Sequence, residues 1–366
     1  MAITLNFPQN RIYMPGARQE WANRLPERHE RTGVPLAIGL LNNMSDGALE
    51  ATERQFLHLL TAAGADLHIE VSFYHFSEVP RGDAAKRYMD GRYHPVEALF
   101  HTKLDGLIVT GREPLFASLR DEPYWHSFGL VHDWARENTL STIWSCLAAH
   151  AAVLHMDGIQ RQRSAQKRCG VFDCVRVSHH PLVRHLLKTF RMPHSRWNGL
   201  PEAELMRNGY QIVTRAEGAD VDCFIKQDSS LFVYFQGHPE YDSDTLLREY
   251  RRDISRFLSG EAAAYPSVPR GYFDVGVERA LLELQAKGNA GSHREVLQFI
   301  ESVAPSMAKE KSWGSSALML YTNWLTEIHA KKEAQVPIAN AEADCATFVP
   351  EPLRNRQAEA FENAGF

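Results

Sequence analysis

One cysteine stands where a reactive thiol could be positioned. Cys146 follows the strand-like run Leu140–Ser145 and precedes a run of small, helix-forming residues, Leu147–Leu154. A cysteine at such a strand-to-helix turn is exposed by the turn, and the amides at the helix N-terminus stabilise its thiolate. This setting matches a nucleophile elbow, although the glycines of that motif are absent. A free cysteine is also commonly a small buried apolar residue, so the turn alone leaves both interpretations open.

A histidine and a carboxylate come after another predicted strand. The apolar run Leu231–Gln236 leads into Gly237-His-Pro-Glu240, so His238 stands at a strand end with Glu240 two residues on. A thiol acyltransferase needs a thiolate, a base that moves a proton, a group that orients the base, and amide donors for the oxyanion. Cys146, His238 and Glu240 can supply the first three. A surface turn with a capping carboxylate is the alternative for this segment taken alone.

Two backbone amides could complete the set. The predicted strand Leu104–Gly111 ends in a glycine, and a backbone N–H can approach a reacting oxygen there because no side chain stands in the way. The amide of Leu147, the first residue after the cysteine, is the second candidate donor. Gly111 and Leu147 are therefore the predicted oxyanion hole.

The elements around these residues alternate between strands and helices. Pro35–Leu41 is a continuous apolar run, the pattern of a strand buried on both faces of a parallel sheet. Four strand-helix alternations up to the Cys146 turn predict an α/β fold with a doubly wound, mostly parallel sheet. Ligands bind such sheets beyond the carboxyl ends of the strands. Gly111 and Cys146 both fall at such ends, so we expect them to face one pocket.

After the Cys146 turn the pattern changes. Short strands predicted over 168–177, 209–214, 222–226 and 231–236 indicate an antiparallel extension of the sheet. Helices are then predicted over 243–258, 275–287, 292–303 and 315–330. We divide the chain into an N-terminal arm, 1–34, an α/β catalytic domain, 35–260, a C-terminal helical segment, 261–333, and a weakly ordered tail, 334–366.

The composition argues against several classes of protein. The net charge is −5, there is no basic stripe for nucleic acid, and no apolar run approaches the ~20 residues of a membrane helix. The N-terminus lacks the pattern of a signal peptide. The five cysteines have no paired spacing, which fits reduced thiols in the cytoplasm. The 17 histidines are scattered and form no metal-binding motif, so we expect no metal and no bound cofactor.

Six segments together resemble the homoserine O-acyltransferase family, which contains homoserine O-succinyltransferases and acetyl-using relatives. The resemblance implies a class I glutamine amidotransferase-like fold. It covers roughly residues 35–325 and is most specific around His238. The segments are Leu40–Ser45 with Thr52–Gln55, Asp105–Gly111, the Cys146 turn, Lys167–Phe172, Pro193–Arg196 and Gly237–Asp253, and Tyr321–Trp324 also resembles the end of family sequences.

The resemblance implies a ping-pong reaction with acyl-CoA as co-substrate. The acyl group would load Cys146 as a thioester and then pass to the hydroxyl of an amino acid, with His238 as base and Glu240 as its partner. We further expect a cytoplasmic homodimer that serves methionine biosynthesis. Its partners would be a small amino acid and acyl-CoA, with no nucleic acid and no membrane.

The resemblance also implies three substrate-binding residues. Arg252 would bind the carboxylate of the amino acid, a role that suits the guanidinium fork. Lys167 and Ser195 would help to bind substrate. Taken singly, Lys167 and Arg252 are ordinary surface charges, and Ser195 is an ordinary helix or turn cap.

This sequence differs from the family pattern around the predicted pocket. The turn reads Cys146-Leu-Ala-Ala-His150, where the family usually has Trp second and Gln fifth. Arg112 follows Gly111 in place of alanine, and its guanidinium could pair with the carboxylate of a succinyl group, which is a hypothesis. The acyl donor, succinyl or acetyl, and the acceptor, homoserine or serine, stay open.

Two other functions fit the same residues. A glutamine amidotransferase-like cysteine hydrolase shares the Cys and His-x-Glu set, but no ammonia-accepting synthetase domain is expected here and the elbow lacks the flanking glycines of that family. A non-catalytic binding protein could keep the same fold. The full set of Cys146, His238 and Glu240 argues against that loss of chemistry.

Overall fold

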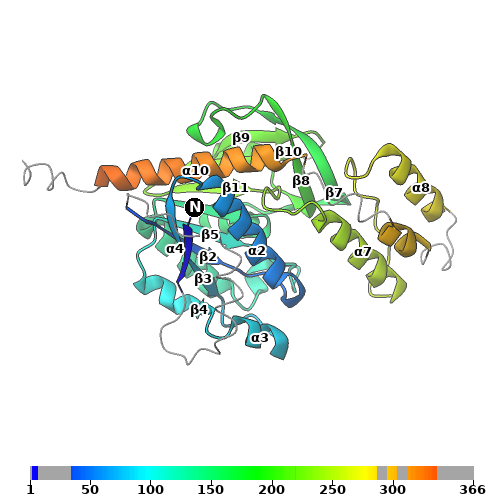
Figure 1. Ribbon diagram of the computed structural model, residues 1–366, viewed down its shortest axis with the longest axis horizontal. Coiled ribbons are helices and arrows are strands. Elements are labelled where there is room, and N and C mark those ends of the chain that lie inside the picture. Colours follow the sequence, from blue (N-terminus) through cyan, green and yellow to red (C-terminus); the bar gives the residue numbers. More distant parts are fainter. Residues whose placement is uncertain (1, 7–33, 219, 287–294, 303–311, 336–366) are drawn as a thin grey trace, which may run out of the picture.

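The computed structural model describes residues 2–6, 34–218, 220–286, 295–302 and 312–335 (Figure 1). These residues build one eleven-stranded sheet with helices on both faces. Its strand order is β1-β3-β2-β5-β6-β11-β10-β9-β7-β8, and β4 pairs with β3 beside this path. The sheet has a parallel half and an antiparallel half, which meet at β11.

The parallel half holds the strands that end at the predicted site. Along the order β1-β3-β2-β5-β6-β11, each strand is parallel to the next one, and β4 is parallel to β3. The central strands are almost wholly buried because helices cover both faces, which explains their continuous apolar sequences. The bounds are β1 Ala2–Asn6, β3 His68–His75, β2 Leu36–Leu41, β4 Tyr93–Pro95, β5 Gly106–Thr110, β6 Ser141–Ser145 and β11 Leu231–Phe235.

The antiparallel half extends the sheet beyond β11. Its strands pair antiparallel in the order β11-β10-β9-β7-β8. The longest pairing joins β7 and β8, whose register shifts between Arg163 and Arg168. The bounds are β10 Asp220–Gln227, β9 Gln211–Ala216, β7 Gln162–Arg176 and β8 Thr189–Gly199.

Two apolar cores lie on opposite faces of the sheet. Side chains alternate along each strand, so Ile108 of β5 joins one core while Leu107 and Val109 join the other. Helices α2 (Asp46–Ala63) and α10 (Gly314–Gln335) cover the first face, and α4 (Trp125–Asn138) and α5 (Leu147–Asp157) cover the second. The predicted doubly wound α/β fold with an antiparallel extension is therefore confirmed.

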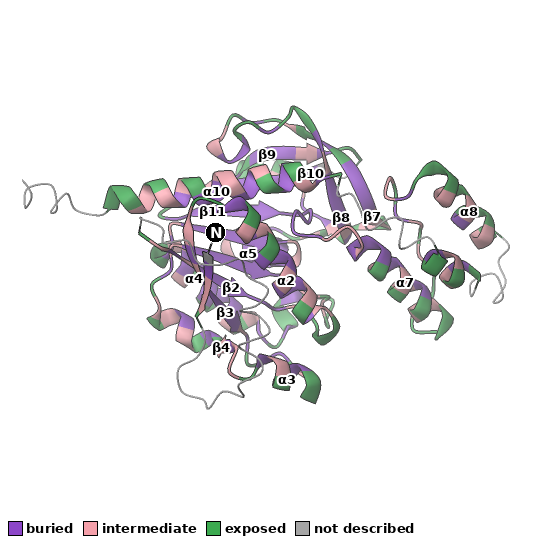
Figure 2. Cartoon of the chain, viewed as in Figure 1, coloured by how far each residue is buried: buried purple, intermediate pink, exposed green. Residues whose placement is uncertain are grey.

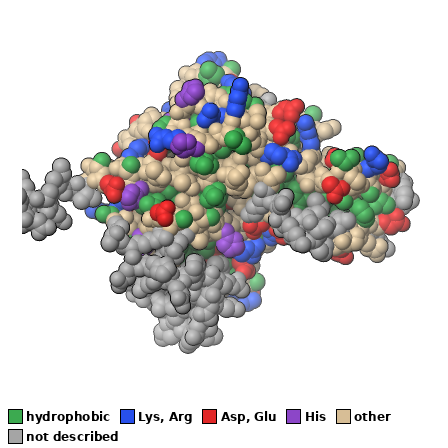
Figure 3. Space-filling view, turned by 45° about the horizontal axis from the view of Figure 1, so that its top comes forward, with side chains coloured by type: hydrophobic (Ala, Val, Ile, Leu, Met, Phe, Trp, Pro, Cys, Tyr) green, Lys and Arg blue, Asp and Glu red, His purple; other side chains and the backbone are tan. Residues whose placement is uncertain are grey.

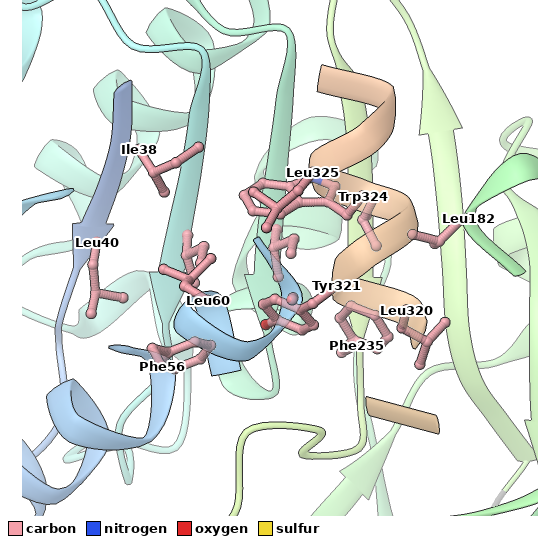
Figure 4. Packing of buried hydrophobic residues seen from close by; sticks show 14 of the residues in the cluster. Ile38, Leu40, Phe56, Leu60, Leu182, Phe235, Leu320, Tyr321, Trp324 and Leu325 are labelled. Carbon is pink, nitrogen blue, oxygen red and sulfur yellow. The ribbon is translucent and has the colours of Figure 1, made fainter. Parts of the chain in front are cut away.

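Helix α10 returns across the sheet from the far end of the chain. Tyr321 and Trp324 pack among Phe56 and Leu60 of α2 in the first core (Figure 4). The indole of Trp324 donates a hydrogen bond from Nε1 to Ser141 Oγ, 2.9 Å away at the start of β6. The predicted C-terminal helix is thus part of the main core and steadies the strand that carries Cys146.

A smaller lobe projects from the sheet. Helix α7 (Thr245–Leu258) buries Leu247, Tyr250 and Ile254 in a third apolar cluster, to which α8 (Val275–Ala286) contributes Leu281. Most of the surface of α8 is exposed (Figure 2). The amphipathic spacing of α7 buries one of its faces and leaves the other free for the charged residues described below.

Several elements differ from the sequence-based expectations. The pattern predicts no strand over 189–199, yet β8 lies there, as an edge strand that tolerates Pro193 and charged side chains. Ser195 therefore sits in a strand, and the helix-cap or turn-cap interpretation is wrong. The N-terminal arm contains β1, and α3 (Asp83–Met89) is a helix that the pattern did not predict. Residues 7–33 and 336–366, most of the predicted arm and tail, lie outside the described residues.

The surface mixes charges of both signs. On the face shown in Figure 3, Lys and Arg side chains are interspersed with Asp and Glu. Among the described residues, no helix is long and apolar enough to cross a membrane.

Candidate active site

Cys146 occupies a strained turn between β6 and α5. Its backbone has φ 52° and ψ −109°, a conformation that is costly for a residue with a side chain. The turn is fixed by the Cys146 amide, which donates to the Phe235 carbonyl at 2.7 Å, and by the Cys146 carbonyl, which accepts from Ala149 at 3.0 Å. The predicted strand-to-helix turn at Cys146 is confirmed, because β6 ends at Ser145 and α5 begins at Leu147. Unpaired amides at a helix N-terminus favour a thiolate.

His238 lies between Cys146 and Glu240. Its Nδ1 is 2.8 Å from Glu240 Oε1, and both side chains are buried. Burial lowers the pKa of His238, but the charges of Cys146 and Glu240 and the hydrogen bond with Glu240 outweigh it, so this pKa stands well above its ordinary value. Since Nδ1 faces the carboxylate, Nε2 is the atom left for the thiol. Two segments far apart in the sequence thus bring a thiol, an imidazole and a carboxylate together.

Gly111 lies against the start of α5. A Cβ placed on Gly111 would be 2.7 Å from the Leu147 amide nitrogen and 2.9 Å from that of Ala148. These distances are too short for real atoms, so any side chain at position 111 would displace the helix terminus or cover its amides. The absence of a side chain keeps the Leu147 N–H open, as the oxyanion-hole prediction requires.

A buried acid-histidine pair underlies the turn that carries His238. His194 Nε2 is 3.2 Å from Asp222 Oδ1, and both side chains are fully buried. Thr214 Oγ1 donates to the other carboxylate oxygen at 2.6 Å. A Cβ on Gly237 would meet Asp222 Oδ1 at 2.6 Å, so the turn rests directly on the pair. The amide of His238 donates to the Pro193 carbonyl at 2.8 Å, which ties the base to β8.

Tyr241 joins the base to the predicted substrate-binding residues. Its ring stacks on His238, and its hydroxyl donates to Glu249 Oε1 at 2.7 Å. The second oxygen of Glu249 accepts a hydrogen bond from Ser195 Oγ. A continuous chain of contacts therefore leads from Cys146 through His238 to Ser195.

Lys167 and Arg252 meet at one carboxylate. Lys167 Nζ is 2.7 Å from Asp253 Oδ2, and the Arg252 guanidinium contacts Asp253 Oδ1 at 2.8 and 3.0 Å. Burial lowers the pKa of Lys167, but Cys169, Glu249 and Asp253 raise it above its ordinary value, so the ammonium stays charged. Two cations thus share the Asp253 carboxylate, and Glu249 is close enough to raise the pKa of both.

Arg112 presents buried donors without protein partners. Its Nε and Nη1 atoms are buried and make no hydrogen bond within the described part of the chain. Asn43 Oδ1 is also buried and has no hydrogen-bond partner among the described residues. The loop continues with exposed Leu115 and Phe116, and its Glu113 pairs with Arg256 of α7 at 3.0 Å. Unpaired buried guanidinium groups are costly, so this one calls for an explanation.

The structure brings together most of the predicted site residues. Cys146, His238 and Glu240 form the central line, and Gly111 and Leu147 lie beside it. Ser195 is connected to His238 through Glu249 and Tyr241, whereas Lys167 and Arg252 meet at Asp253, one helical turn further along α7. Arg112 follows Gly111 directly in the chain.

The sequence pattern did not predict the residues that hold the predicted site residues in place. Glu249 and Asp253 stand one helical turn apart on α7, and this i, i+4 spacing of carboxylates beside Arg252 was an available signal. Asp222 and His194 carried no such signal, because two separate strands supply them. His150, in place of the usual glutamine, bonds Gln236 Oε1 through Nε2 at 2.9 Å and so ties α5 to the end of β11.

The other described cysteines are poorly suited to be nucleophiles. Cys146, Cys169, Cys174 and Cys223 are all free thiols. Burial raises the pKa of Cys169 to about 11, and burial also raises the pKa of Cys174 and Cys223. Cys345 lies outside the described residues.

The sequence of this chain matches those of known proteins. A sequence profile described as homoserine O-succinyltransferase matches residues 24–334. A homoserine O-succinyltransferase of Rhodopseudomonas palustris is 44% identical over 305 residues, which cover 83% of this chain and 91% of that protein. One of Bradyrhizobium japonicum is 43% identical over 301 residues, 82% of this chain and 92% of that protein.

Solved structures of low sequence identity are also similar. A glutamine amidotransferase from Methylobacillus flagellatus has a TM-score of 0.45 and 15% identity, with 81% of this chain and 96% of that chain covered. One from Thermotoga maritima has a TM-score of 0.40 and 11% identity, with 80% and 98% covered. The fold assignment itself rests on the strand order and pairing described above, and the family assignment on sequence identity across most of both chains. The chain belongs to the homoserine O-succinyltransferase family.

Proposed function

We propose that this enzyme transfers an acyl group from acyl-CoA to the hydroxyl of homoserine through a thioester on Cys146. Family membership supports homoserine as the acceptor, because the relatives carry that substrate in their names. The observation that carries the covalent route is the position of His238 between Cys146 and Glu240. A raised imidazole pKa beside a thiol favours a thiolate-imidazolium pair at neutral pH.

The first half-reaction loads the enzyme. The Cys146 thiolate attacks the thioester carbonyl of acyl-CoA, and the oxygen becomes an oxyanion that the Leu147 amide can stabilise beside Gly111. The bond to the CoA sulfur then breaks. That sulfur takes the proton from the His238 imidazolium, so CoA leaves as a neutral thiol and the imidazole is left as a free base.

The second half-reaction unloads it. His238 Nε2 takes the proton of the homoserine hydroxyl while the oxygen attacks the carbonyl of the Cys146 acyl-enzyme. Collapse of the intermediate breaks the C–S bond, which restores the thiolate while the imidazole keeps the proton. Glu240 holds the ring through Nδ1 in both halves and stabilises the imidazolium.

The positive groups near α7 suit the amino acid. In this proposal Arg252 receives the carboxylate of homoserine, and Lys167 and Ser195 help to fix the substrate. Glu249 and Asp253 hold these three side chains in place. The Arg112 side chain, with its unpaired buried donors, receives the distal carboxylate of a succinyl group, which makes succinyl-CoA the preferred donor.

Mass spectrometry of the intact protein tests the covalent step. Incubation with succinyl-CoA or acetyl-CoA should add one acyl group, and peptide mapping should find it on Cys146. The Cys146→Ala variant should take up none, whereas Cys169→Ser should be labelled like the unmodified protein, because the raised pKa of Cys169 keeps that thiol protonated. Homoserine should discharge the adduct faster than serine or water does. Failure of every acyl-CoA to label Cys146 would remove the proposal.

The hydrolase alternative uses the same residues and needs its own test. A glutaminase would be alkylated at Cys146 by a glutamine-analogue electrophile and would release ammonia from glutamine. In our proposal neither occurs at a rate comparable with acyl transfer. Labelling by that electrophile together with no labelling by acyl-CoA would favour the hydrolase.

The assembly and location of the enzyme are further parts of the proposal. We propose a cytoplasmic homodimer, and the free thiols of the four described cysteines are compatible with a reducing compartment. Light scattering of the purified protein would test the dimer, and fractionation of the source cells would test the location.

A further inference from the structure

Three potential metal ligands converge away from the catalytic residues, on the flank formed by α4 and α5. They are His132 and Asp133 of α4 and His155 near the end of α5. We propose that they form a binding site for a divalent first-row transition ion of the zinc class. The site would tie the two helices together and is independent of the proposed function.

The spacing of the ligand atoms fits such an ion. Asp133 Oδ1 is 3.1 Å from His132 Nδ1 and 3.0 Å from His155 Nε2, and the three ligand atoms all lie within 4.8 Å of one another. Around a zinc ion with bonds of about 2.0–2.2 Å, neighbouring ligand atoms stand roughly 3.0–3.6 Å apart. Two of the three edges are thus already at the bound spacing, and the third, between the two nitrogens, is no longer than 4.8 Å.

Packing holds both imidazole rings in place. His132 is buried between Trp144 and Phe232, with ring centroids 5.3 and 5.1 Å away. His155 lies against Gly129, where an added Cβ would be 2.8 Å from its Cε1. The rings therefore cannot turn away freely, which reduces the entropy that ion binding would otherwise cost.

The chemistry of the ligands selects the class of ion. Two imidazoles and one carboxylate suit Zn²⁺, Co²⁺, Ni²⁺ or Cu²⁺, whereas Mg²⁺ and Ca²⁺ prefer oxygen ligands alone. The Asp133 side chain is 61% exposed and that of His155 is 26% exposed, so water can reach the ion and complete its coordination. Arg136, whose charge affects His132, pairs with Glu137 and Asp228.

A second cluster of possible metal ligands among the described residues is closed to solvent. Cys174, His194 and Asp222 also lie within 4.8 Å of one another, but all three are fully buried. Gly237 packs against Asp222, and Thr214 occupies the other carboxylate oxygen. That cluster supports the His238 turn and leaves neither a path nor coordination positions for an ion.

Titration with Co²⁺ tests the site, followed by competition with Zn²⁺. The unmodified protein should bind one Co²⁺ with a visible absorption spectrum that lacks a thiolate charge-transfer band, and Zn²⁺ should remove that spectrum. Asp133→Asn changes an exposed side chain and should not affect folding, yet it should weaken binding about tenfold to a hundredfold. His155→Gln should do the same or more.

A matched control comes from α10. His329 and Glu333 face each other at 3.5 Å as a two-ligand pair with no third partner in the metal clusters of the described residues. His329→Gln should leave Co²⁺ binding unchanged. The thermal transition of the unmodified protein should rise with added Zn²⁺, and this rise should be lost in Asp133→Asn. Equal binding by all four proteins, or a thiolate band in the cobalt spectrum, would overturn the proposal.

Discussion

The ring of Tyr241 lies almost parallel to the imidazole of His238, with centroids 4.1 Å apart and 19° between the planes. The Tyr241 hydroxyl donates to Glu249 Oε1 at 2.7 Å, and its carbonyl accepts from Trp313 Nε1 at 3.2 Å. The tyrosine is therefore fixed at three points. It limits how far the imidazole can tilt away from the line between Cys146 and Glu240.

Two substitutions separate the ring of Tyr241 from its hydroxyl. Tyr241→Phe keeps the stacking and should lower kcat only a few fold, whereas Tyr241→Leu removes the flat surface and should lower kcat about tenfold to a hundredfold, because a misplaced base costs that much. Steady-state kinetics with homoserine would measure both. Tyr272→Phe, which loses a 2.6 Å hydrogen bond to the Ser243 carbonyl, is the control and should be near normal. Equal kcat values for Phe and Leu at 241 would contradict a positioning role.

Gly111→Ala should remove most of the oxyanion stabilisation. The added Cβ would stand 2.7 Å from the Leu147 nitrogen, and neither the helix terminus nor the β5 end can give way freely. We expect kcat to fall about 10²-fold, the usual cost of losing one oxyanion donor, with little change in homoserine KM. Gly47→Ala, where a Cβ meets nothing within 4 Å, is the matched control. An active Gly111→Ala enzyme with normal kcat would place the oxyanion elsewhere.

The predicted and unpredicted parts of the site differ in how they are encoded. Cys146, Gly111 and His238 each follow a strand within three residues, so local pattern places them at the carboxyl edge of the sheet. Their mutual contact then follows from the order β5-β6-β11, in which the strands that carry them are neighbours. Sequence reasoning therefore suffices for residues positioned by strand ends.

Residues positioned by tertiary packing were not predictable in this way. His194 and Asp222 come from β8 and β10, and nothing in either strand signals the other. The pattern over 189–199 is interrupted by Pro193 and Arg196, so even the strand was missed. The cluster of His132, Asp133 and His155 has no spacing signal in the sequence, because its side chains come from two separate helices.

The pKa of His238 gives a signed prediction for Glu240→Gln. The raised pKa means that the folded protein holds a proton that the unfolded chain, with a pKa near 6.5, releases more readily. Binding of this proton stabilises the folded protein. The stabilisation is complete below the His238 pKa of the unfolded chain and is lost as the pH rises through the His238 pKa of the folded protein. Glu240→Gln removes one of the charges that raise it. Denaturant unfolding should therefore show the largest loss of stability at about pH 5 to 6 and a shrinking loss toward high pH.

The same argument extends to the thiol. Cys146→Ser removes the charge of Cys146, the second group that raises the pKa of His238. NMR titration should therefore find a lowered His238 pKa in each of the two variants, Cys146→Ser and Glu240→Gln. Asp228→Asn, on the turn before β11, should leave that pKa unchanged because the Asp228 side chain pairs with Arg136 and is not among the groups that shift His238. A His238 pKa that does not move in either site variant would mean that the imidazole is charged by something other than these two groups.

Asp222→Asn tests the buried support of the His238 turn. The asparagine keeps the size of the carboxylate that touches Gly237 but weakens the contacts with His194 and Thr214. If the pair positions His238, kcat should fall about tenfold, KM should hardly change, and the pH-rate profile should shift. A loss of stability with an unchanged kcat and pH profile in the folded fraction would instead mark a purely structural pair. Asp228→Asn again serves as the control.

Arg112 is predicted to select the acyl donor. Its buried Nε and Nη1 atoms have no protein partner, so a ligand carboxylate would gain charge-assisted hydrogen bonds that no described residue competes for. Arg112→Ala should reduce kcat/KM for succinyl-CoA about 30-fold or more while that for acetyl-CoA changes little, because only succinyl carries the distal charge. Arg112→Lys should fall between, since it keeps the charge and loses the fork. Arg120→Ala changes an exposed arginine of the short 3-10 helix Leu119–Asp121 that follows this loop, and it should preserve the ratio. A succinyl to acetyl ratio that is the same in Arg112→Ala and in the unmodified enzyme would show that the guanidinium has another role.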